Sequence, residues 1–412
     1  MNEVVISDPP ITDAIIVGSK ESVLYNFLDR YYGLRFNVIT GNLENCKVKI
    51  NGNAEIISDR ELNTICIRIF SALEKEKISR EYLNCYLNSK YLKDFNPFFD
   101  FIQQNEHLTR SQNLIQELAD TIESDTPLEN IRKYIKHWGC GMIASIYGSQ
   151  SPLTLVLAGA KLNTGKTEFF RRLLPKELQE YYAESSLDGG KDDDILMCKK
   201  LIIMDDEFGG KSKQDQRHFK AMTSKQVMSI RLPYGKRTQE MRRICSLAGT
   251  SNDISLLNDP YGNRRILPIN VLGIDHKKYN EIDKSALFMA FVDLYRTGFH
   301  WKFTSEDIKQ LNDASEDFHA PNPESELISK FFCIPDNEND GEYLTNTIIK
   351  DILETKTKQK IWSATKLGLE LIKLGFVRSK KGNQKVYYVK EIRPEQYIPP
   401  SPKNTPKEQY PF

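Results

Sequence analysis

The 412-residue sequence has no long apolar run. No stretch approaches the roughly 20 apolar residues that a membrane-spanning helix requires. Residues 1–10 also lack the charged start and apolar core that are typical of a secretory signal peptide. We therefore expect a cytoplasmic protein with no membrane partner.

Cysteine and histidine residues are too scattered along the sequence to indicate a metal site. The seven cysteines include no Cys-x-x-Cys pair, and the six histidines show no metal-ligand spacing. We expect reduced, mostly buried thiols, because a disulfide framework or a zinc site would show regular cysteine spacing. The net charge of only +1 conceals one basic segment, residues 360–393, in which nine Lys or Arg residues oppose two Glu residues.

The most informative segment of the sequence is residues 155–174. It contains an apolar run, a glycine-bearing loop and then Gly165, Lys166 and Thr167 before further apolar residues. This order predicts a strand, a phosphate-binding loop and a helix. In such a loop, backbone N–H groups bind phosphate oxygens, the lysine neutralises the β- and γ-phosphates, and the threonine hydroxyl binds Mg²⁺.

The spacing of this loop departs from the usual pattern. Five residues separate Gly159 from Gly165, where the pattern has four. Either Ala160 fills the first glycine position or the loop is one residue longer. The residues expected to bind ATP are Gly159, Asn163, Thr164, Gly165, Lys166 and Thr167.

An acidic cluster follows the next apolar run. Residues 200–204 are mostly apolar and lead directly into Asp205, Asp206 and Glu207. Such a run predicts a buried parallel strand whose carboxyl end faces a ligand, and adjacent carboxylates are tolerated where they bind a divalent cation. By position, Asp205 would hold Mg²⁺ and Asp206 would orient the attacking water. The alternative assigns these roles one residue later, to Asp206 and Glu207.

A third apolar strand, beginning at Ile244, ends in Thr250, Ser251 and Asn252. An uncharged amide at the tip of a strand beside the phosphate loop can position water and sense the γ-phosphate, which makes Asn252 a candidate. On its own, a Ser/Asn turn after a strand would be the simpler interpretation. The two preceding motifs favour the functional one.

Two adjacent arginines, Arg264 and Arg265, follow a Gly-Asn turn. They cannot both face a core, because a guanidinium stays charged and is rarely buried without a partner. As arginine fingers they would reach the γ-phosphate bound by a neighbouring subunit, a contact worth on the order of 10³–10⁵ in rate. The sequence leaves open which of the two is the finger.

The motifs occur in a definite order: Trp138–Ala144, the phosphate loop, the acidic strand, Arg231–Lys236, Thr250–Asn252 and Gly262–Arg265. This order resembles the virulence-associated protein E family, which is similar to the superfamily three helicases of phages, plasmids and pathogenicity islands. The resemblance covers roughly residues 125–310. It implies an AAA+-like ATPase core that uses ATP and Mg²⁺, a hexameric ring, and a role in replication of a mobile element.

The same resemblance gives a role to the basic segment 231–237, where a Tyr-Gly turn is flanked by basic residues and followed by Arg242 and Arg243. In the resembling helicases a hairpin at this place projects into the channel of the ring and grips DNA. Basic side chains at its tip would contact phosphates, and a tyrosine would stack on a base. A solvated hairpin without a ligand is the alternative. The expected DNA contacts are Arg231, Tyr234, Lys236 and Arg237.

The predicted fold class is α/β, with an AAA+-like core built on a parallel sheet. The length allows two or three domains. A mostly helical amino-terminal module precedes the core; it shows no acidic triad or zinc ribbon of a primase, and we expect it to help the ring assemble. The expected divisions are 1–20 (flexible start), 21–124 (module), 125–317 (core), 318–325 (a linker whose prolines block helix), 326–392 (winged-helix-like domain) and 393–412 (proline-rich tail).

The pattern of residues 326–392 predicts a winged helix. Helical segments at 344–353 and 364–374, the latter capped by Ser363 and ended by Gly375, precede a hairpin around a Lys-Gly-Asn turn. This order resembles the small domain often fused to this ATPase family. Contact with duplex DNA is expected, with protein docking as the alternative. The basic residues expected to make it are Lys366, Arg378, Lys380, Lys381 and Lys385.

The sequence therefore predicts an ATP-dependent DNA helicase or translocase that acts on single- and double-stranded DNA during replication of a phage or other mobile element. One rival is an AAA+-like ATPase that remodels proteins or acts as a phage-defence switch. The other is a structural ring subunit that binds nucleotide without turnover.

Overall fold

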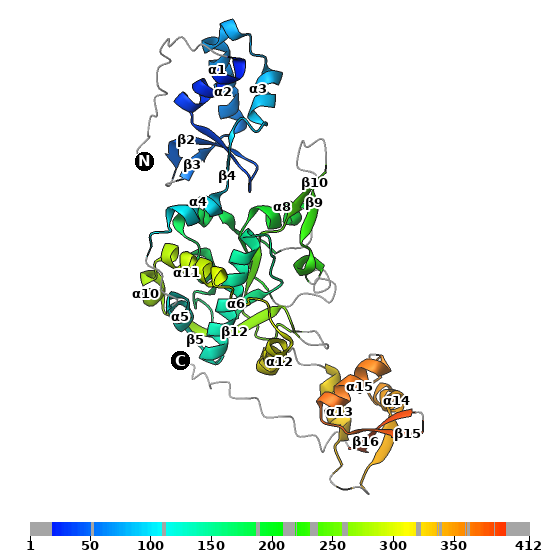
Figure 1. Cartoon of the computed structure of the whole chain (residues 1–412). Coiled ribbons are helices and arrows are strands. Elements are labelled where there is room, and N and C mark those ends of the chain that lie inside the picture. The colour runs from blue at the N-terminus through cyan, green and yellow to red at the C-terminus, as the bar shows by residue number, and fades with distance from the viewer. Residues whose placement is uncertain are drawn as a thin grey trace, which may run out of the picture. The chain divides into compact units, whose positions relative to one another are not determined.

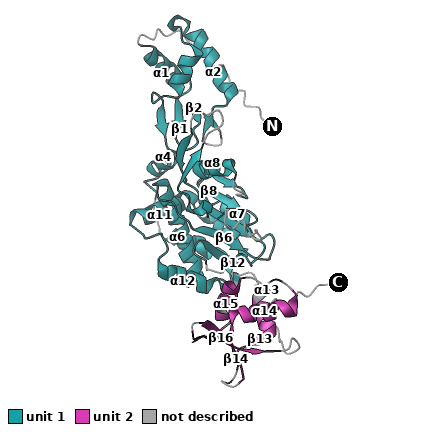
Figure 2. Ribbon diagram, turned by 90° about the vertical axis from the view of Figure 1, so that its right-hand side faces the viewer, with its two compact units in different colours: residues 1–319 teal, residues 320–412 magenta. Residues whose placement is uncertain are grey.

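The structure is a computed structural model of the whole chain (Figure 1). Two compact units divide it, residues 1–319 and 320–412 (Figure 2). Helices and sheets with parallel strands confirm the expected α/β class. The described residues are 19–50, 53–108, 113–186, 190–208, 219, 221–230, 238–257, 263–318, 323–335, 337, 340–358, 360, 363–382 and 384–392.

The first unit begins with a module of helices packed on a four-stranded sheet. Each of its first three helices starts at a serine whose hydroxyl accepts a backbone N–H, which satisfies a donor that the first turn leaves unpaired. In sheet order the strands are β3 (Asn53–Ile56), β2 (Leu43–Ile50), β1 (Leu34–Asn37) and β4 (Lys93–Phe95). The helices are α1 (Lys20–Tyr31), α2 (Asp59–Ala72) and α3 (Arg80–Leu87).

A six-stranded sheet forms the centre of the first unit. Its inner strands are buried on both faces, which explains their almost continuous apolar sequences. All neighbouring strands are parallel except the pair at one edge, β5 and β12. In sheet order the strands are β5 (Ile122–Ser124), β12 (Ile266–Ile274), β6 (Thr154–Ala158), β11 (Ser246–Ser251), β8 (Ile202–Asp205) and β7 (Tyr182–Glu184).

Helices pack around this sheet. The longest holds Trp138, whose indole N–H donates to the Leu247 carbonyl of β11 at 2.7 Å. The helices are α4 (Pro97–Gln104), α5 (Asn113–Asp120), α6 (Leu128–Ile146), α7 (Lys166–Arg171), α8 (Lys191–Lys199), α10 (His276–Glu281), α11 (Lys284–Arg296) and α12 (Ser305–Ala314).

A buried asparagine joins the module to the sheet. Asn37, at the end of β1, donates its side-chain N–H groups to Glu44 at 2.6 Å and to the Tyr181 hydroxyl at 2.8 Å. The Tyr181 ring also packs edge-on against Phe98 of α4, with centroids 4.8 Å apart. This hydrogen bond therefore links the module to the segment that leads into β7, while the module keeps an apolar cluster of its own.

The second unit contains three helices and a small antiparallel sheet. Two details of the prediction were wrong: Leu344 lies in a strand rather than a helix, and Pro323 begins a helix, where a missing N–H costs nothing. Ser363 precedes its helix without a side-chain cap hydrogen bond. The elements are α13 (Pro323–Phe331), β13 (Phe332–Cys333), β14 (Glu342–Thr345), α14 (Asn346–Thr357), α15 (Ala364–Lys373), β15 (Arg378–Lys381) and β16 (Gln384–Glu391).

Among the described helices, none combines the length and the apolar character needed to span a membrane.

A two-stranded hairpin, β9 (Val227–Ile230) and β10 (Gln239–Arg242), extends from the first unit. Arg243, which the sequence groups with the basic residues of this hairpin, is fully buried. Its guanidinium donates to four carbonyl oxygens, those of Ser151, Met222, Thr223 and Cys245, at 2.9–3.4 Å. Arg243 therefore anchors the base of the hairpin and presents no charge to a ligand.

Replacing Arg243 with alanine should lower the free energy of unfolding by about 3 kcal/mol, since it leaves several buried carbonyl oxygens without a donor. Chemical denaturation of the full chain measures this loss. Arg242→Ala, at an exposed neighbouring position, is the matched control and should change stability by less than about 0.5 kcal/mol. Equal effects of the two substitutions would contradict the anchoring role.

Candidate active site

Three predicted motifs meet at the carboxyl ends of the parallel strands in the six-stranded sheet. In the parallel register, Ala158 of β6 pairs with Ser251 of β11, and Gly249 of β11 pairs with Asp205 of β8. The segments that follow these strands therefore leave the sheet on the same side, at the carboxyl ends of the strands, where open α/β sheets bind ligands. The structure thus brings together the glycine-bearing loop, the acidic cluster and the polar end of the third strand.

The loop between β6 and α7 is confined by close contacts at both of its glycines. A Cβ atom on Gly159 would lie 2.4 Å from the Val271 carbonyl oxygen. Gly165 has a φ of 87°, and a Cβ there would lie 2.3 Å from Cε1 of His276. Any larger residue at either position would require the contacted part of the same chain, Val271 or His276, to move. His276 was missed by the sequence analysis, because nothing links residue 276 to the loop before the chain folds.

Lys166 is buried at the first position of α7. Its Nζ donates to the carbonyl oxygens of Gly159 at 2.9 Å and Lys161 at 3.1 Å. Burial lowers the pKa of this ammonium group, and the nearby carboxylate of Asp206 acts in the opposite direction. Lys166 is therefore held inside the loop by two backbone carbonyls, near enough to Asp206 for the two charges to interact.

The carboxylate of Asp206 accepts two hydroxyl groups from two different elements. Thr167 Oγ1, on α7, donates to Asp206 Oδ1 at 2.7 Å. Thr250 Oγ1, in β11, donates to the same oxygen at 2.7 Å and also contacts the Asp206 carbonyl at 3.0 Å. The sequence analysis missed Thr250, although it is in the same short polar motif as Asn252.

Asp205 and Glu207 have different surroundings. Asp205 is buried at the end of β8, and its Oδ1 accepts the backbone N–H of Glu207 at 3.3 Å. Glu207 is exposed, as is Asn252, which directly follows β11. The residue next to the Thr167 hydroxyl is therefore Asp206, and this contact favours the later of the two registers that the sequence left open.

Thr164 supplies the best test of whether the loop fits a nucleotide. Its side chain is only 6% exposed, and among the described residues Oγ1 has no hydrogen-bond partner. An unsatisfied buried hydroxyl costs about 1–3 kcal/mol. A phosphate oxygen bound in the loop would accept this hydrogen bond and recover that free energy.

No group of three His, Cys, Asp or Glu side chains in the described part of the chain converges as a metal site. Mg²⁺ does not require one, because it commonly binds one or two protein ligands together with nucleotide phosphates and water. Thr167 and Asp206 provide such a partial set.

The two predicted arginines lie at the opposite end of the parallel strands, where the strands begin. They directly precede β12, whose first residue, Ile266, pairs with Thr154 at the start of β6. Arg264 is exposed, whereas Arg265 donates to the Ser224 hydroxyl at 2.8 Å. The structure therefore does not bring the arginine pair to the acidic cluster of its own chain.

Buried Asn263 fixes the backbone at the arginine pair. Its Oδ1 accepts the backbone N–H groups of Arg265 at 3.1 Å and Ile266 at 2.9 Å. It was also missed by the sequence analysis, which interpreted it only as part of a Gly-Asn turn. The four hairpin-tip residues Arg231, Tyr234, Lys236 and Arg237 lie outside the described residues, between the paired strands β9 and β10.

Four of the five predicted basic residues of the second unit lie on its β15–β16 hairpin. Lys366 is half-buried on α15, and the other four are exposed on β15 and β16. Three apolar side chains on α15 and before β15, those of Leu369, Ile372 and Val377, are exposed as well. The four exposed basic residues are Arg378, Lys380, Lys381 and Lys385.

Comparison with known proteins gives one family match. Residues 103–320, more than half of the chain, match the virulence-associated protein E-like domain. No curated protein matches the chain. Two solved apo structures of the NrS-1 C-terminal region are similar to it at 13% sequence identity. The similarity covers 89% of this chain and 98% of each of those chains, with TM-scores of 0.47 and 0.48.

Proposed function

The chain belongs to the virulence-associated protein E-like family, and on this premise we propose that it is an ATP-dependent DNA helicase or translocase acting in replication of a phage or other mobile element. The observation that carries the proposal is the contact between Thr167, beside buried Lys166, and Asp206 at one sheet edge. A loop lysine, a hydroxyl and a carboxylate in this arrangement fit an ATPase core of the AAA+ type with a phosphate-binding loop.

Different loop residues would bind different parts of a nucleotide. Lys166 would neutralise the terminal phosphates, and the Thr164 hydroxyl would donate to a phosphate oxygen. Thr167 and Asp206 would hold Mg²⁺, the ion that shields the phosphate charge. Close contacts at Gly159 and Gly165 would keep the loop backbone in place around the phosphates.

The remaining polar groups would orient water. In the register that the Thr167 contact favours, Glu207 accepts a proton from the attacking water, and buried Asp205 positions Glu207 through its backbone N–H. Asn252 would sense the γ-phosphate from the end of β11. Thr250 couples this strand to the metal-binding carboxylate.

The placement of the arginines supports a ring. From Thr154 to Ala158 the central strand β6 spans roughly 13 Å. An arginine near the start of β6 therefore does not reach the loop that follows its end in the same chain. Arg264 is the proposed finger, since Arg265 is held by Ser224. A ring in which each subunit completes the next subunit's site, hexameric by the family resemblance, satisfies this geometry.

DNA contacts would come from the hairpin tip at residues 231–237 and from the second unit, proposed as a winged helix with a basic wing. The exposed Leu369 and Ile372 on α15 favour a second candidate function, in which this unit docks a protein and the ATPase remodels it. Stimulation of turnover by DNA separates the two candidates.

ATP hydrolysis by the full chain, measured with and without single-stranded DNA, tests the proposal. We expect DNA to stimulate turnover several-fold, and Lys166→Ala to reduce it on the order of a hundredfold, because phosphate charge is no longer neutralised. Lys309→Ala, which removes an exposed lysine of α12, is the control and should leave turnover unchanged. Turnover indifferent to DNA would favour protein remodelling, and absence of turnover would contradict an ATPase.

Mixing two inactive variants tests the proposed ring. A Lys166→Ala subunit loses the lysine of its phosphate loop and keeps the finger, Arg264. An Arg264→Ala subunit keeps an intact phosphate loop and loses the finger. In an equal mixture, random assembly pairs an intact loop with an intact finger at about a quarter of the sites, so turnover should return to about that fraction. A mixture as inactive as its components would contradict a finger acting between subunits.

A further inference from the structure

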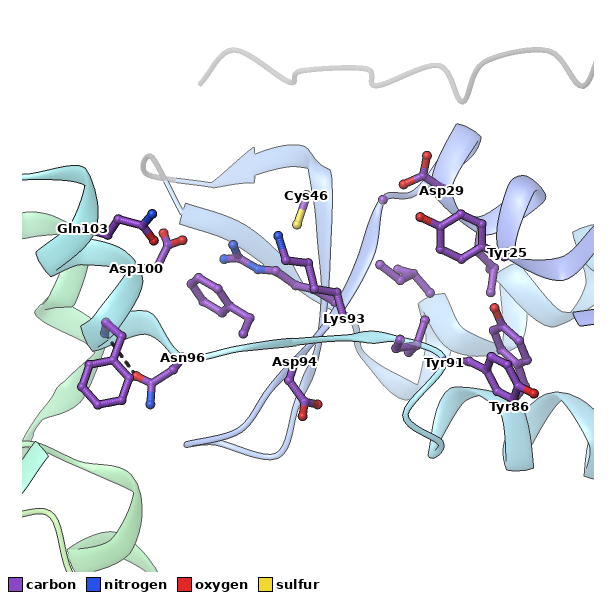
Figure 3. Close-up of a pocket in the computed structure, with 17 residues that line it drawn as sticks. Tyr25, Asp29, Cys46, Tyr86, Tyr91, Lys93, Asp94, Asn96, Asp100 and Gln103 are labelled. Carbon is purple, nitrogen blue, oxygen red and sulfur yellow. Dashed lines mark hydrogen bonds between the residues drawn. The ribbon is translucent and has the colours of Figure 1, made fainter. Parts of the chain in front are cut away.

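A cavity of about 430 Å³ lies in the amino-terminal module, away from the proposed ATPase site. Residues of α1, β1, β4 and α4 line it, as does the segment before β4 (Figure 3). Its volume is in the range of cavities that bind small molecules or single side chains. The sequence analysis assigned this module no ligand.

Three tyrosines form one end of this cavity. The rings of Tyr86 and Tyr91 stack, with centroids 5.4 Å apart and planes inclined by 8°. Tyr25, on α1, lines the same cavity, and Figure 3 shows it near these rings together with Asp29. Tyr25 is 53% exposed and Tyr91 61%, so both rings keep large surfaces available to a partner.

The Tyr86 hydroxyl provides a second, independent observation at this cavity. The residue is only 4% exposed, and among the described residues its hydroxyl has no hydrogen-bond partner. Burial raises the pKa of Tyr86, and Tyr25 and Tyr91 raise it further, so the group is neutral near pH 7. A donor entering the cavity would relieve the cost of this unsatisfied oxygen.

The charge of the lining favours a cation. Three carboxylates, those of Asp29, Asp94 and Asp100, face only two basic groups, those of Arg35 and Lys93. Arg35 is already paired with Glu44 at 2.7 Å. The surplus of carboxylates repels phosphate groups, which disfavours nucleic acid as the ligand.

We propose that this cavity binds the guanidinium group of an arginine side chain presented by a partner protein. A planar guanidinium stacks on tyrosine rings and donates several hydrogen bonds in fixed directions. Tyr25 and Tyr91 supply the rings, Asp29 accepts a charged hydrogen bond, and the Tyr86 oxygen accepts another. The cavity is thus an arginine-docking site, and the proposal does not depend on the ATPase activity.

Calorimetric titration of the full chain with the blocked peptide Gly-Arg-Gly tests this directly. The matched peptide carries citrulline, which keeps the shape of arginine and removes its charge. We expect the arginine peptide to bind at least about tenfold more tightly, and Tyr91→Ala or Asp29→Asn to weaken it about three- to tenfold. Tyr343→Ala removes a comparably exposed tyrosine from the second unit and should have no effect.

Tyr86→Phe separates a binding role from a structural one. Without peptide it should raise the melting temperature, because it removes an unsatisfied buried hydroxyl, and it should nevertheless weaken the arginine peptide. Absence of binding, equal binding of the citrulline peptide, or binding unchanged in Tyr91→Ala and Asp29→Asn would overturn the proposal. Binding of a thymidine oligonucleotide that Tyr91→Ala abolishes would overturn it in favour of nucleic acid.

Discussion

The parallel pairing of β6 with β11 and of β11 with β8 is the constraint on which the candidate site depends. It ends three strands at one edge, so that residues distant in sequence meet at a single carboxylate. The hydroxyls of Thr167 and Thr250, which are 83 positions apart in the chain, both donate to Asp206. Thr250 lies in β11, so a change of its register by one residue would turn its side chain to the other face of the sheet and away from Asp206.

The same constraint separates the arginine pair from the acidic cluster of its own chain. Parallel strands begin at the opposite edge from where they end, and β12 begins beside the start of β6. Arg264 therefore lies near the start of β6, whereas the phosphate loop follows its end. Asn263, through hydrogen bonds to the following backbone, fixes this placement. The proposed assembly therefore rests on the strand order.

Much of this could be predicted from the sequence because the signals are local. The glycines of the loop and the acids after an apolar run act within a few residues of themselves. The contacts that determine how the site residues are placed join segments that are distant in the sequence. The approach of His276 to Gly165, the second hydroxyl on Asp206 and the burial of Arg243 by four carbonyls depend on segments far apart in sequence. The role of Arg243 could not be predicted for this reason, because its four acceptors come from separate segments of the chain.

The central claim is that Thr167 and Asp206 form a magnesium-dependent nucleotide site. Titration of the full chain with a non-hydrolysable ATP analogue, with and without Mg²⁺, tests it most directly. The account predicts that Mg²⁺ tightens binding at least about tenfold, and that Thr167→Val removes this gain while keeping the weaker, metal-free binding through Lys166. Nucleotide affinity that does not respond to Mg²⁺, or a Thr167→Val variant that responds as fully as the unaltered chain, would contradict it.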